Sequence, residues 1–309
     1  MKNTYKPEGL NSKIDTKSKS FIKNNLSIIG EDIIYEGTVT KCDSTLNLWV
    51  DMCGIKVLIP NDEVMYLFPG ELKKDIAIIS RVGKNVCFKI IGIKKDAFGN
   101  EILIASRRLA QIECLQEYIK TLKPGDIIDA KVTHMEQFGA FCDIGCGIVA
   151  LLSVDCISVS RISHPKDRFD NGDVIRVAVK GINEDGRIYL THKELLGTWE
   201  ENAAQFSCGQ TVSGIIRSIE SYGIFIELTP NLAGLAETKE DVYPSQNAAV
   251  YIKAIIPERM KIKLVLIDST TDKTPRKPIK YIGDIHLHNH IDSWLYSPIH
   301  SSKKIETIF

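Results

Sequence analysis

The sequence predicts a mainly β protein in which three similar units follow one another and are joined by short helices. Short strand-like runs, each ended by glycine, proline or asparagine turns, fill the stretch from Lys123 to Leu195. A second copy follows at an offset of 84 residues, which relates Phe138 to Tyr222 and Phe141 to Phe225, and a weaker copy precedes it. Landmarks that recur at one spacing indicate an internal repeat. A chain of 309 residues has room for two or three domains.

The best-preserved unit, residues 122–195, carries a recognisable order of turns. A Lys-Pro-Gly-Asp turn at 123–126 leads to Phe-Gly-Ala-Phe at 138–141, then to Asn-Gly-Asp-Val at 171–174 and a strand at 186–191. This order and spacing resemble the ribosomal S-one RNA-binding domain family, whose repeat is an oligonucleotide-binding (OB) barrel. The resemblance covers about one whole domain. It implies the fold class for the chain: mainly β, with three tandem five-stranded OB-fold barrels joined by short helices.

The two other units depart from this pattern. Residues 208–268 form a divergent repeat that keeps the aromatic segment and loses much of the central loop, and residues 31–108 form a degenerate repeat. Apolar residues spaced three to four apart predict linker helices over 109–121 and 196–207.

Both ends of the chain lie outside the repeats. Residues 1–30 carry six lysines against two acids, which predicts a basic flexible N-terminal arm able to reach phosphate; a solvated end without that role is the alternative. Residues 269–309 read as a polar linker and a β-rich C-terminal appendage, because residues 281–288 alternate as in a strand. We expect this appendage to dock on the third barrel.

The composition limits the class of protein. Net charge is zero, so any affinity for nucleic acid must come from local placement of charge and aromatic rings. The eight cysteines form no Cys-x-x-Cys pair and are expected to be reduced and mostly buried. No apolar run approaches the roughly 20 residues that span a bilayer. The sequence therefore predicts a cytoplasmic protein that has no contact with a membrane.

The resemblance also implies an RNA-binding face built from two aromatics, a histidine, an aspartate and a basic residue. In this sequence the aromatics fall on Phe138 and Phe141, the basic residue on Arg187 and the aspartate position on Asn183. The histidine position falls on Ala150, and this departure implies weaker affinity.

Aromatic rings suit single strands because bases stack on them, which is worth about 1–3 kcal/mol per base. Phe138 and Phe141 are three residues apart, so on a regular strand they would point to opposite faces. Gly139 permits a bulge that would bring both to one surface. Lys131 is expected to contact the RNA backbone together with the basic and amide positions. The alternative places Phe141 in the core and Phe138 over the barrel end.

In the divergent repeat the aromatic positions fall on Tyr222 and Phe225 and the basic position on Lys261. Glu237 occupies the histidine position, where an acid would repel phosphate, so this repeat either binds RNA weakly or binds protein. In the degenerate repeat Trp49 remains as a stacking candidate.

Catalytic and metal motifs are sparse. His286, His288 and His290 alternate, which on a strand would line one face and suit a metal ion, but no second half of such a site is evident. We find no phosphate loop, nucleophile elbow or His-Glu-x-x-His segment. The sequence therefore predicts no enzyme activity, cofactor or metal.

These observations predict a non-catalytic protein that binds single-stranded mRNA or rRNA in translation or RNA metabolism, with the ribosome or RNA-turnover proteins as candidate partners. The main alternative is a protein-interaction scaffold whose degenerate OB-folds dock on the ribosome or another RNA-processing assembly. Neutral charge, Ala150 and Glu237 favour the scaffold; the repeated aromatic pair and Arg187 favour RNA. A metal-dependent enzyme built on the tail histidines is the third reading.

Overall fold

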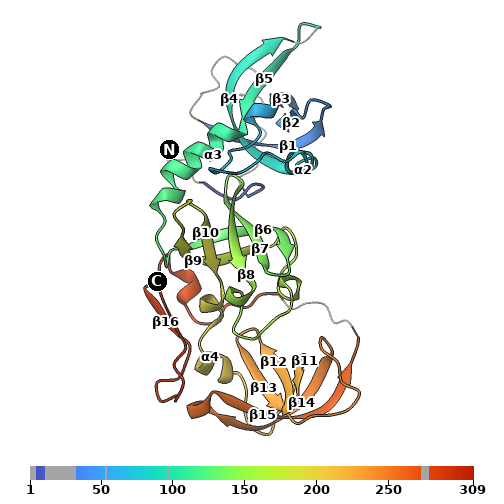
Figure 1. Cartoon of the computed structure of the whole chain (residues 1–309), viewed down its shortest axis with the longest axis vertical. Helices are drawn as coiled ribbons and strands as arrows, with labels where there is room; N and C mark the ends of the chain where they lie inside the picture. Colours follow the sequence, from blue (N-terminus) through green and yellow to red (C-terminus); the bar gives the residue numbers. More distant parts are fainter. Residues whose placement is uncertain (1–4, 11–32, 53, 96–97, 273–277) are drawn as a thin grey trace.

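The computed structural model describes residues 5–10, 33–52, 54–95, 98–272 and 278–309. It shows three closed five-stranded barrels that follow one another along the long axis of the molecule (Figure 1). In each barrel the strand order is first, second, third, fifth, fourth; the third and fifth strands run parallel and all other neighbours antiparallel. The prediction of three tandem OB-type barrels joined by short helices is confirmed.

The strands alternate inward and outward residues, as expected for a small closed barrel. Each barrel encloses a hydrophobic core of its own. The first barrel consists of β1 (Ile34–Cys42), β2 (Leu48–Met52), β3 (Ile55–Ile59), β4 (Asn85–Lys95) and β5 (Glu101–Ser106). The middle barrel consists of β6 (Ile127–Glu136), β7 (Gly139–Gly145), β8 (Ile148–Ser153), β9 (Val174–Ile182) and β10 (Ile188–Thr191). The third consists of β11 (Thr211–Glu220), β12 (Gly223–Thr229), β13 (Leu232–Ala236), β14 (Asn247–Ile256) and β15 (Lys261–Thr270).

Short helices follow the last strand of the first and middle barrels. α3 (Arg107–Glu117) begins where the Ser106 hydroxyl accepts a hydrogen bond from the Leu109 N–H, and η3 (Ile119–Thr121) continues it. η6 (Lys193–Leu196) and α4 (Trp199–Ala203) follow the middle barrel, and a capping box between Thr198 and Glu201 starts α4. The other short helices before the C-terminal appendage lie between strands of the barrels: η2 (Asn61–Glu63), α2 (Asp75–Ile79), η4 (Val154–Cys156), η5 (Pro165–Asp167) and η7 (Pro257–Arg259). No helix among the described residues is long and apolar enough to cross a membrane.

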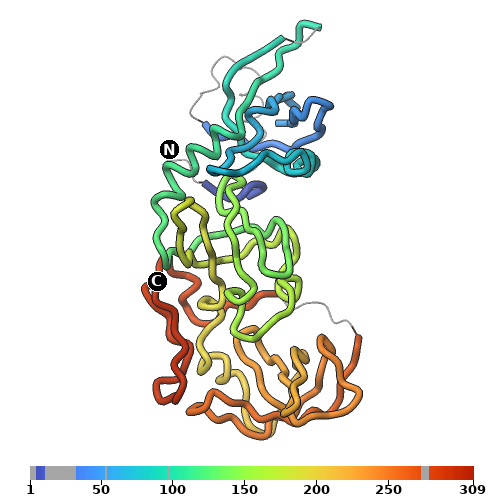
Figure 2. Tube along the Cα trace, in the orientation of Figure 1, coloured from blue at the N-terminus to red at the C-terminus, as the bar shows by residue number. Residues whose placement is uncertain are grey.

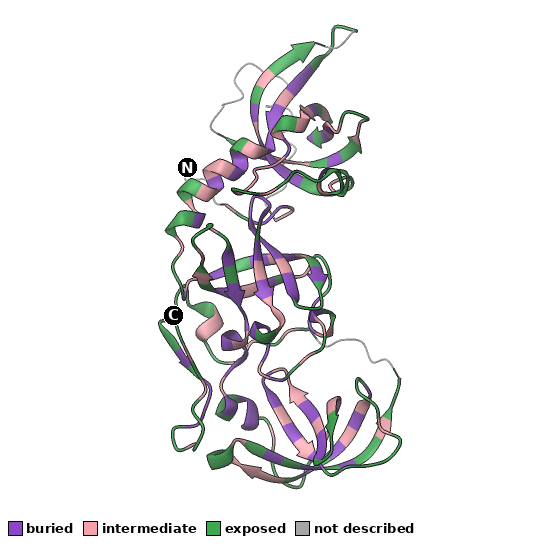
Figure 3. Cartoon of the chain, in the orientation of Figure 1, coloured by how far each residue is buried: buried purple, intermediate pink, exposed green. Residues whose placement is uncertain are grey.

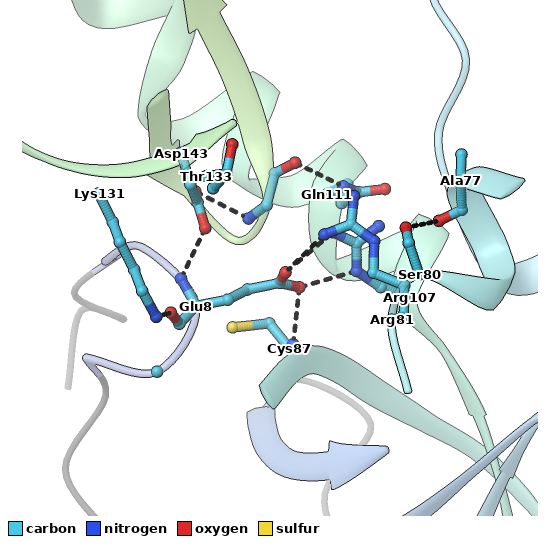
Figure 4. Close-up of polar contacts among 12 residues, drawn as sticks. Glu8, Ala77, Ser80, Arg81, Cys87, Arg107, Gln111, Lys131, Thr133 and Asp143 are labelled. Carbon is cyan, nitrogen blue, oxygen red and sulfur yellow. Dashed lines mark hydrogen bonds and ion pairs between the residues drawn. The ribbon is translucent and has the colours of Figure 1, made fainter. Parts of the chain in front are cut away.

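Residues 5–10 lie between the first and middle barrels (Figure 4), so the prediction of a flexible arm is wrong for this segment. Glu8 is buried there, and its carboxylate accepts hydrogen bonds from the Arg107 guanidinium (2.7 and 3.0 Å) and from the Cys87 N–H (3.0 Å). The Glu8 N–H donates to Asp143 of the middle barrel (2.7 Å). The segment therefore joins two barrels by polar contacts that the sequence pattern did not suggest. The other residues of the predicted arm lie outside the described part of the chain.

The charges at this junction perturb one another. Burial alone would raise the pKa of Glu8, but Arg107 and Arg81 outweigh it and hold that pKa below its ordinary value. Burial, together with the charge of Glu8, raises the pKa of Asp143 to about 7. Lys131 donates from Nζ to the Glu8 carbonyl (2.8 Å). The junction is thus a buried network in which each charge has a partner.

A second buried acid marks the junction of the middle and third barrels. Glu227 occupies the strand position that corresponds to Asp143, 84 residues later. Its carboxylate accepts from Arg168 of the middle barrel (2.6 Å) and from Arg217 of its own barrel (2.7 Å). Asn231 adds a hydrogen bond from the Val159 N–H (3.0 Å) to its side-chain oxygen. The repeat therefore places a buried acid at both junctions: Asp143 is held by backbone N–H groups, and Glu227 is held by two arginines.

The C-terminal appendage runs beside both the middle and the third barrel (Figure 2). Its two-stranded sheet, β16 (Ser293–Leu295) with β17 (Glu306–Ile308), brings Trp294 into the core of the third barrel. Ile291 packs against Ile127 and Leu195 of the middle barrel. Docking on the third barrel alone is therefore too narrow a prediction. Figure 3 shows buried residues along these contacts and inside the barrels, whereas the tip of the β4–β5 hairpin is exposed.

The strand predicted over 281–288 is wrong, because the structure has only a short helical turn there, η8 (Ile285–Leu287). A closed barrel leaves no strand edge to which another strand can add. The segment is held instead by single contacts: Tyr281 accepts a hydrogen bond on its hydroxyl from the Arg176 N–H (2.8 Å). Gly125, with φ +91°, lets the tail approach so closely that a Cβ there would lie 2.1 Å from the Ile291 carbonyl oxygen.

Replacing Glu8 by alanine should lower the free energy of unfolding by about 3–5 kcal/mol, because it leaves the buried Arg107 unpaired. Urea unfolding followed by circular dichroism measures this loss. Glu240→Ala, which removes an exposed acid from the third barrel, is the control and should change stability by less than about 0.5 kcal/mol. Equal stability of the two variants would show that the Glu8 contacts contribute little.

Lowering the pH should reduce the free energy of unfolding through protonation of His192. This side chain is buried between the Phe169 and Tyr281 rings, and burial lowers its pKa from 6.5 to about 4. The unfolded chain therefore takes up the proton first, so stability present above pH 6.5 is lost as pH falls toward 4. Between pH 7 and 4.5 the loss attributable to His192 should be on the order of 2–3 kcal/mol.

The measurement is the free energy of unfolding at both pH values for wild type and His192→Phe, and the variant should lose less on acidification. His300→Phe is the control, since His300 is exposed, and its pH profile should follow the wild type. A His192→Phe profile parallel to the wild type would contradict the assignment.

Candidate nucleic-acid interface

Phe138 and Phe141 meet on one outer surface of the middle barrel. Phe138 lies in the two-residue turn between β6 and β7, and Phe141 lies on β7. Their ring centroids are 5.9 Å apart at 90°, an edge-to-face contact, and Phe138 is 57% exposed. The core alternative for Phe141 does not hold, because its ring is only half-buried on the outer face.

The bulge expected at Gly139 lies elsewhere. The ladder between β6 and β7 shifts register between Val132 and His134, on the partner strand. Gly139 serves a different purpose: a Cβ there would lie 2.6 Å from the Leu152 carbonyl oxygen, so its absence lets β7 approach β8. The two aromatic rings share a surface because Phe138 belongs to the turn.

The strand register extends this pair into a row across four strands. His134 on β6 pairs with Phe141, Phe141 with Leu151 on β8, and Leu151 with Tyr189 on β10. The His134 ring stacks on Phe141, with centroids 6.0 Å apart and planes at 20°, and Tyr189 is 38% exposed. We name these four residues the aromatic row.

Sequence reasoning missed both His134 and Tyr189. Tyr189 stands between the buried Ile188 and Leu190 on β10. Because side chains alternate between the two faces of a strand, the sequence could have predicted that Tyr189 points outward. The outward position of His134 could not be predicted, because the register shift before it reverses which residues of β6 point outward.

Arg187 and Asn183 belong to the turn that joins β9 and β10. The Asn183 side-chain oxygen accepts from the Arg187 N–H (2.7 Å), and the Asn183 N–H donates to the Arg187 carbonyl (3.0 Å). The Arg187 guanidinium lies 3.2 Å from a carboxylate oxygen of Glu71 in the first barrel. Asn183 thus shapes the turn, while Arg187 is an exposed cation beside the row.

Two further positions look different in the structure than in the sequence. Lys131 donates to the Glu8 carbonyl at the junction of the barrels, so its ammonium is occupied and the structure does not bring it together with the aromatic pair. Ala150 is only 2% exposed on β8, and it lines the cavity between the two barrels described below, so it does not stand on the exposed row itself.

Two hollows flank Leu151 and Tyr189, which line both of them. The larger, about 310 Å³, lies between the middle barrel and loop 65–71 of the first barrel. The other, about 300 Å³, is lined also by Ser153, Lys180 and Asn183. Lys180 is an exposed cation at this face, with Nζ 3.2 Å from the Cys156 sulfur, and sequence reasoning missed it as well.

The third barrel repeats the aromatic pair with the same geometry. The Tyr222 and Phe225 centroids are 6.1 Å apart at 90°, and Tyr222 is 68% exposed. A register shift between Ile216 and Ser218 precedes its row, which reads Ser218, Phe225, Leu235 and Lys263. Lys263 takes the place that Tyr189 has in the middle barrel, and the exposed Lys261 precedes it by two residues on β15. The third barrel therefore has cations where the middle barrel has a tyrosine.

The first barrel has the equivalent shift, between Val39 and Lys41, but a poorer row. It reads Lys41, Trp49, Leu58 and Ile104. The indole N–H of Trp49 donates to the Asp43 carboxylate (3.2 Å), which fixes the ring. Trp49 is the only aromatic side chain of the four.

The tail histidines do not line one face. His290 contacts the carboxylates of Asp126 (2.7 Å) and Asp292 (3.3 Å), whereas the ring of His286 stacks on Tyr281 with centroids 5.2 Å apart. Hydrogen bonding to Asp126 raises the pKa of His290. Within the ranges that the structure describes, no group of three or more His, Cys, Asp or Glu side chains is arranged to hold a metal ion.

Comparison with known proteins identifies the family to which the middle barrel belongs. Residues 121–193 match the family model of the S1 RNA binding domain. The middle barrel belongs to the S1 domain family. The resemblance read from the turn order is thereby confirmed, and the match covers the S1 barrel with its aromatic row.

Relatives of the chain include ribosomal proteins. The small ribosomal subunit protein bS1 of Leuconostoc lactis is 28% identical over 198 residues, which cover 62% of this chain and 44% of the relative. The bS1 homolog of Bacillus subtilis is 29% identical over 163 residues, which cover 51% of this chain and 42% of the relative. The chain spans less than half the length of these curated relatives. A multidomain protein with nucleic acid binding domains from Streptococcus pneumoniae aligns with 78% of this chain and 75% of its own, at 14% identity and a TM-score of 0.26.

Proposed function

We propose that the protein binds single-stranded mRNA or ribosomal RNA, without catalysis, by stacking bases on the middle and third barrels. The observation that carries this proposal is the aromatic row of the S1 barrel together with Phe138: three aromatic rings and an imidazole on one outer face. Flat exposed rings bind bases of any sequence, because every base has a π-face.

Local cations supply the contacts to phosphate that net charge does not. Arg187 and Lys180 flank the row of the middle barrel, and Lys261 and Lys263 lie at the corresponding edge of the third. Each phosphate contact with a single strand should contribute a salt slope of about −0.7 in log K. A neutral protein with a few well-placed cations is expected to show a shallow but measurable salt dependence.

The barrels act together in this proposal. A strand held by one barrel meets the next at high effective concentration, so weak individual sites add up to useful affinity. The buried acids at both junctions, Asp143 and Glu227, favour a defined spacing between neighbouring barrels.

The names of the relatives favour a role in translation, with the ribosome as partner and the cytoplasm as location. A second function, docking on a protein, suits the first barrel. Only one of its four row residues is aromatic, and two apolar side chains between β3 and β4 are strongly exposed: Leu72 (85%) and Ile76 on α2 (68%). Exposed apolar side chains are typical of contact sites for proteins where they form a patch, and these two are the candidates for such a site.

The double variant Phe138→Ala/Phe141→Ala should lose about 2 kcal/mol or more of RNA-binding free energy, because two stacking rings are removed. The measurement is fluorescence anisotropy of a labelled, unstructured RNA of about 20 nucleotides at two salt concentrations. Phe98→Ala, which removes an exposed ring on the β4–β5 hairpin, is the matched control and should bind as the wild type does. Absence of binding by wild type at low salt would end the RNA proposal and favour a protein partner.

Tyr189→Ala tests the part of the row that only the structure revealed. We expect a loss of about 1–2 kcal/mol in the same assay, since one stacking surface disappears. Tyr251→Ala is the control, because Tyr251 is similarly exposed (40% against 38%) but lies on β14, outside the third barrel's row. Equal affinity of the two variants would exclude Tyr189 from the binding face.

A further inference from the structure

The cavity of about 310 Å³ beside the aromatic row has walls from two barrels. Phe141, Leu151 and Tyr189 line it from the S1 barrel, and Tyr66 and Phe68 line it from the first barrel. Cavities that hold small ligands measure about 300–1,000 Å³ and are mostly apolar with a few polar groups. The space therefore suits one flat group of modest size with polar edges, because charged and amide side chains line it as well: Glu71, Arg81, Arg107, Gln111 and Arg187.

The wall from the first barrel is held in place. Tyr66 donates its N–H to the Gln111 side-chain oxygen (2.7 Å), and Gln111 donates in turn to the Gly147 carbonyl of the middle barrel (3.3 Å). The Tyr66 and Phe68 rings meet edge to face, with centroids 5.3 Å apart. Gln111 is buried on α3, so the same side chain positions the loop and joins the two barrels.

The cavity continues the aromatic surface without a break. Phe141 lines it and also contacts Phe138, so a strand that stacks on this pair reaches the cavity within the next base or two. Closed in this way between two aromatic walls, a base would lose more contact with water than on the open row. Desolvation of this kind strengthens stacking and narrows the shape of base that is accepted.

The mouth of the cavity carries the exposed ion pair of Arg187 with Glu71. Their side chains are 55% and 34% exposed, and ion pairs of this kind contribute little to stability. Glu71 also accepts a hydrogen bond from the Phe68 N–H (3.2 Å), so its carboxylate stabilises the turn of its own loop as well as pairing with Arg187. A phosphate can therefore take the place of Glu71 at Arg187 while the loop keeps its shape.

We propose that this cavity takes one unstacked nucleobase of the bound strand, between Tyr66 and Phe68 of the first barrel and Tyr189 of the S1 barrel. The inference rests on the proposed function, single-strand RNA binding, and adds that the site is shared by two barrels. The first barrel, whose own row is poor in aromatic residues, contributes to RNA binding through its loop at the neighbour's face.

The test uses the full chain and the double variant Tyr66→Ala/Phe68→Ala, with a 20-nucleotide oligouridine that carries 5-iodouridine. We expect about a tenfold loss of affinity, and in the wild type we expect photo-crosslinks to Tyr66 or Phe68 that peptide mass spectrometry locates. Leu72→Ala, directly after loop 65–71 and outside the cavity lining, is the matched control and should retain wild-type affinity for RNA. Tyr66→Phe keeps the ring and should bind within about twofold of wild type, which shows that the ring and not the hydroxyl is needed; a wild-type circular dichroism spectrum and melting curve of Tyr66→Ala/Phe68→Ala separate lost stacking from lost fold.

The outcomes distinguish this inference from the function on which it rests. If Phe138→Ala/Phe141→Ala abolishes binding while Tyr66→Ala/Phe68→Ala binds as the wild type and no crosslink reaches residues 65–71, the shared cavity is wrong and RNA binding stands. If the wild type binds no oligouridine at low salt, the proposed function fails and the cavity has no RNA base to hold.

Discussion

The ion pair between Glu8 and Arg107 anchors the segment 5–10 to the first barrel, and the main chain of Glu8 ties the same segment to the middle barrel. Both side chains are almost fully buried, at 6% and 1% exposure, so each would be costly without the other. Glu8 also links through its N–H to Asp143 and through its carbonyl to Lys131, both on the middle barrel. Loop 65–71 can face the aromatic row only while the two barrels keep this arrangement. The proposed base cavity therefore depends on a contact made by six residues near the N-terminus.

A common register device shapes the outer face of every barrel. In each, the ladder between the first two strands shifts by one residue just before the row begins. The shift brings a first-strand residue into line with the outward residue of the second strand, which is aromatic in all three barrels: Trp49, Phe141 and Phe225. The three rows differ in the residues that flank this aromatic side chain, so each barrel presents a different outer face. The middle row offers His134 and Tyr189 for stacking, and the third offers Lys263 at the edge.

Neutral net charge is consistent with this division. Several cations are used inside the molecule: Arg107, Arg168 and Arg217 pair with buried acids at the junctions. On the outer face of the middle barrel, Arg187 and Lys180 lie at the two hollows that Tyr189 also lines. Under the proposed function, such a surface holds bases mainly by stacking and depends less on bulk attraction to phosphate.

The sequence by itself determined the repeated barrel, the aromatic pairs Phe138–Phe141 and Tyr222–Phe225, and the exposed Arg187, because turn chemistry and two-residue alternation are local properties of the chain. Only the tertiary structure decided the rest of the site. His134 joins the row through a register shift that alternation cannot reveal, and Tyr66 and Phe68 reach it from another barrel. The sequence pattern also did not predict where residues 5–10 lie or which barrels the C-terminal appendage contacts. Contacts between residues about 80 to 165 positions apart, such as Glu8 with Cys87 or Asp126 with His290, arise from packing of complete barrels, for which a local pattern carries no signal.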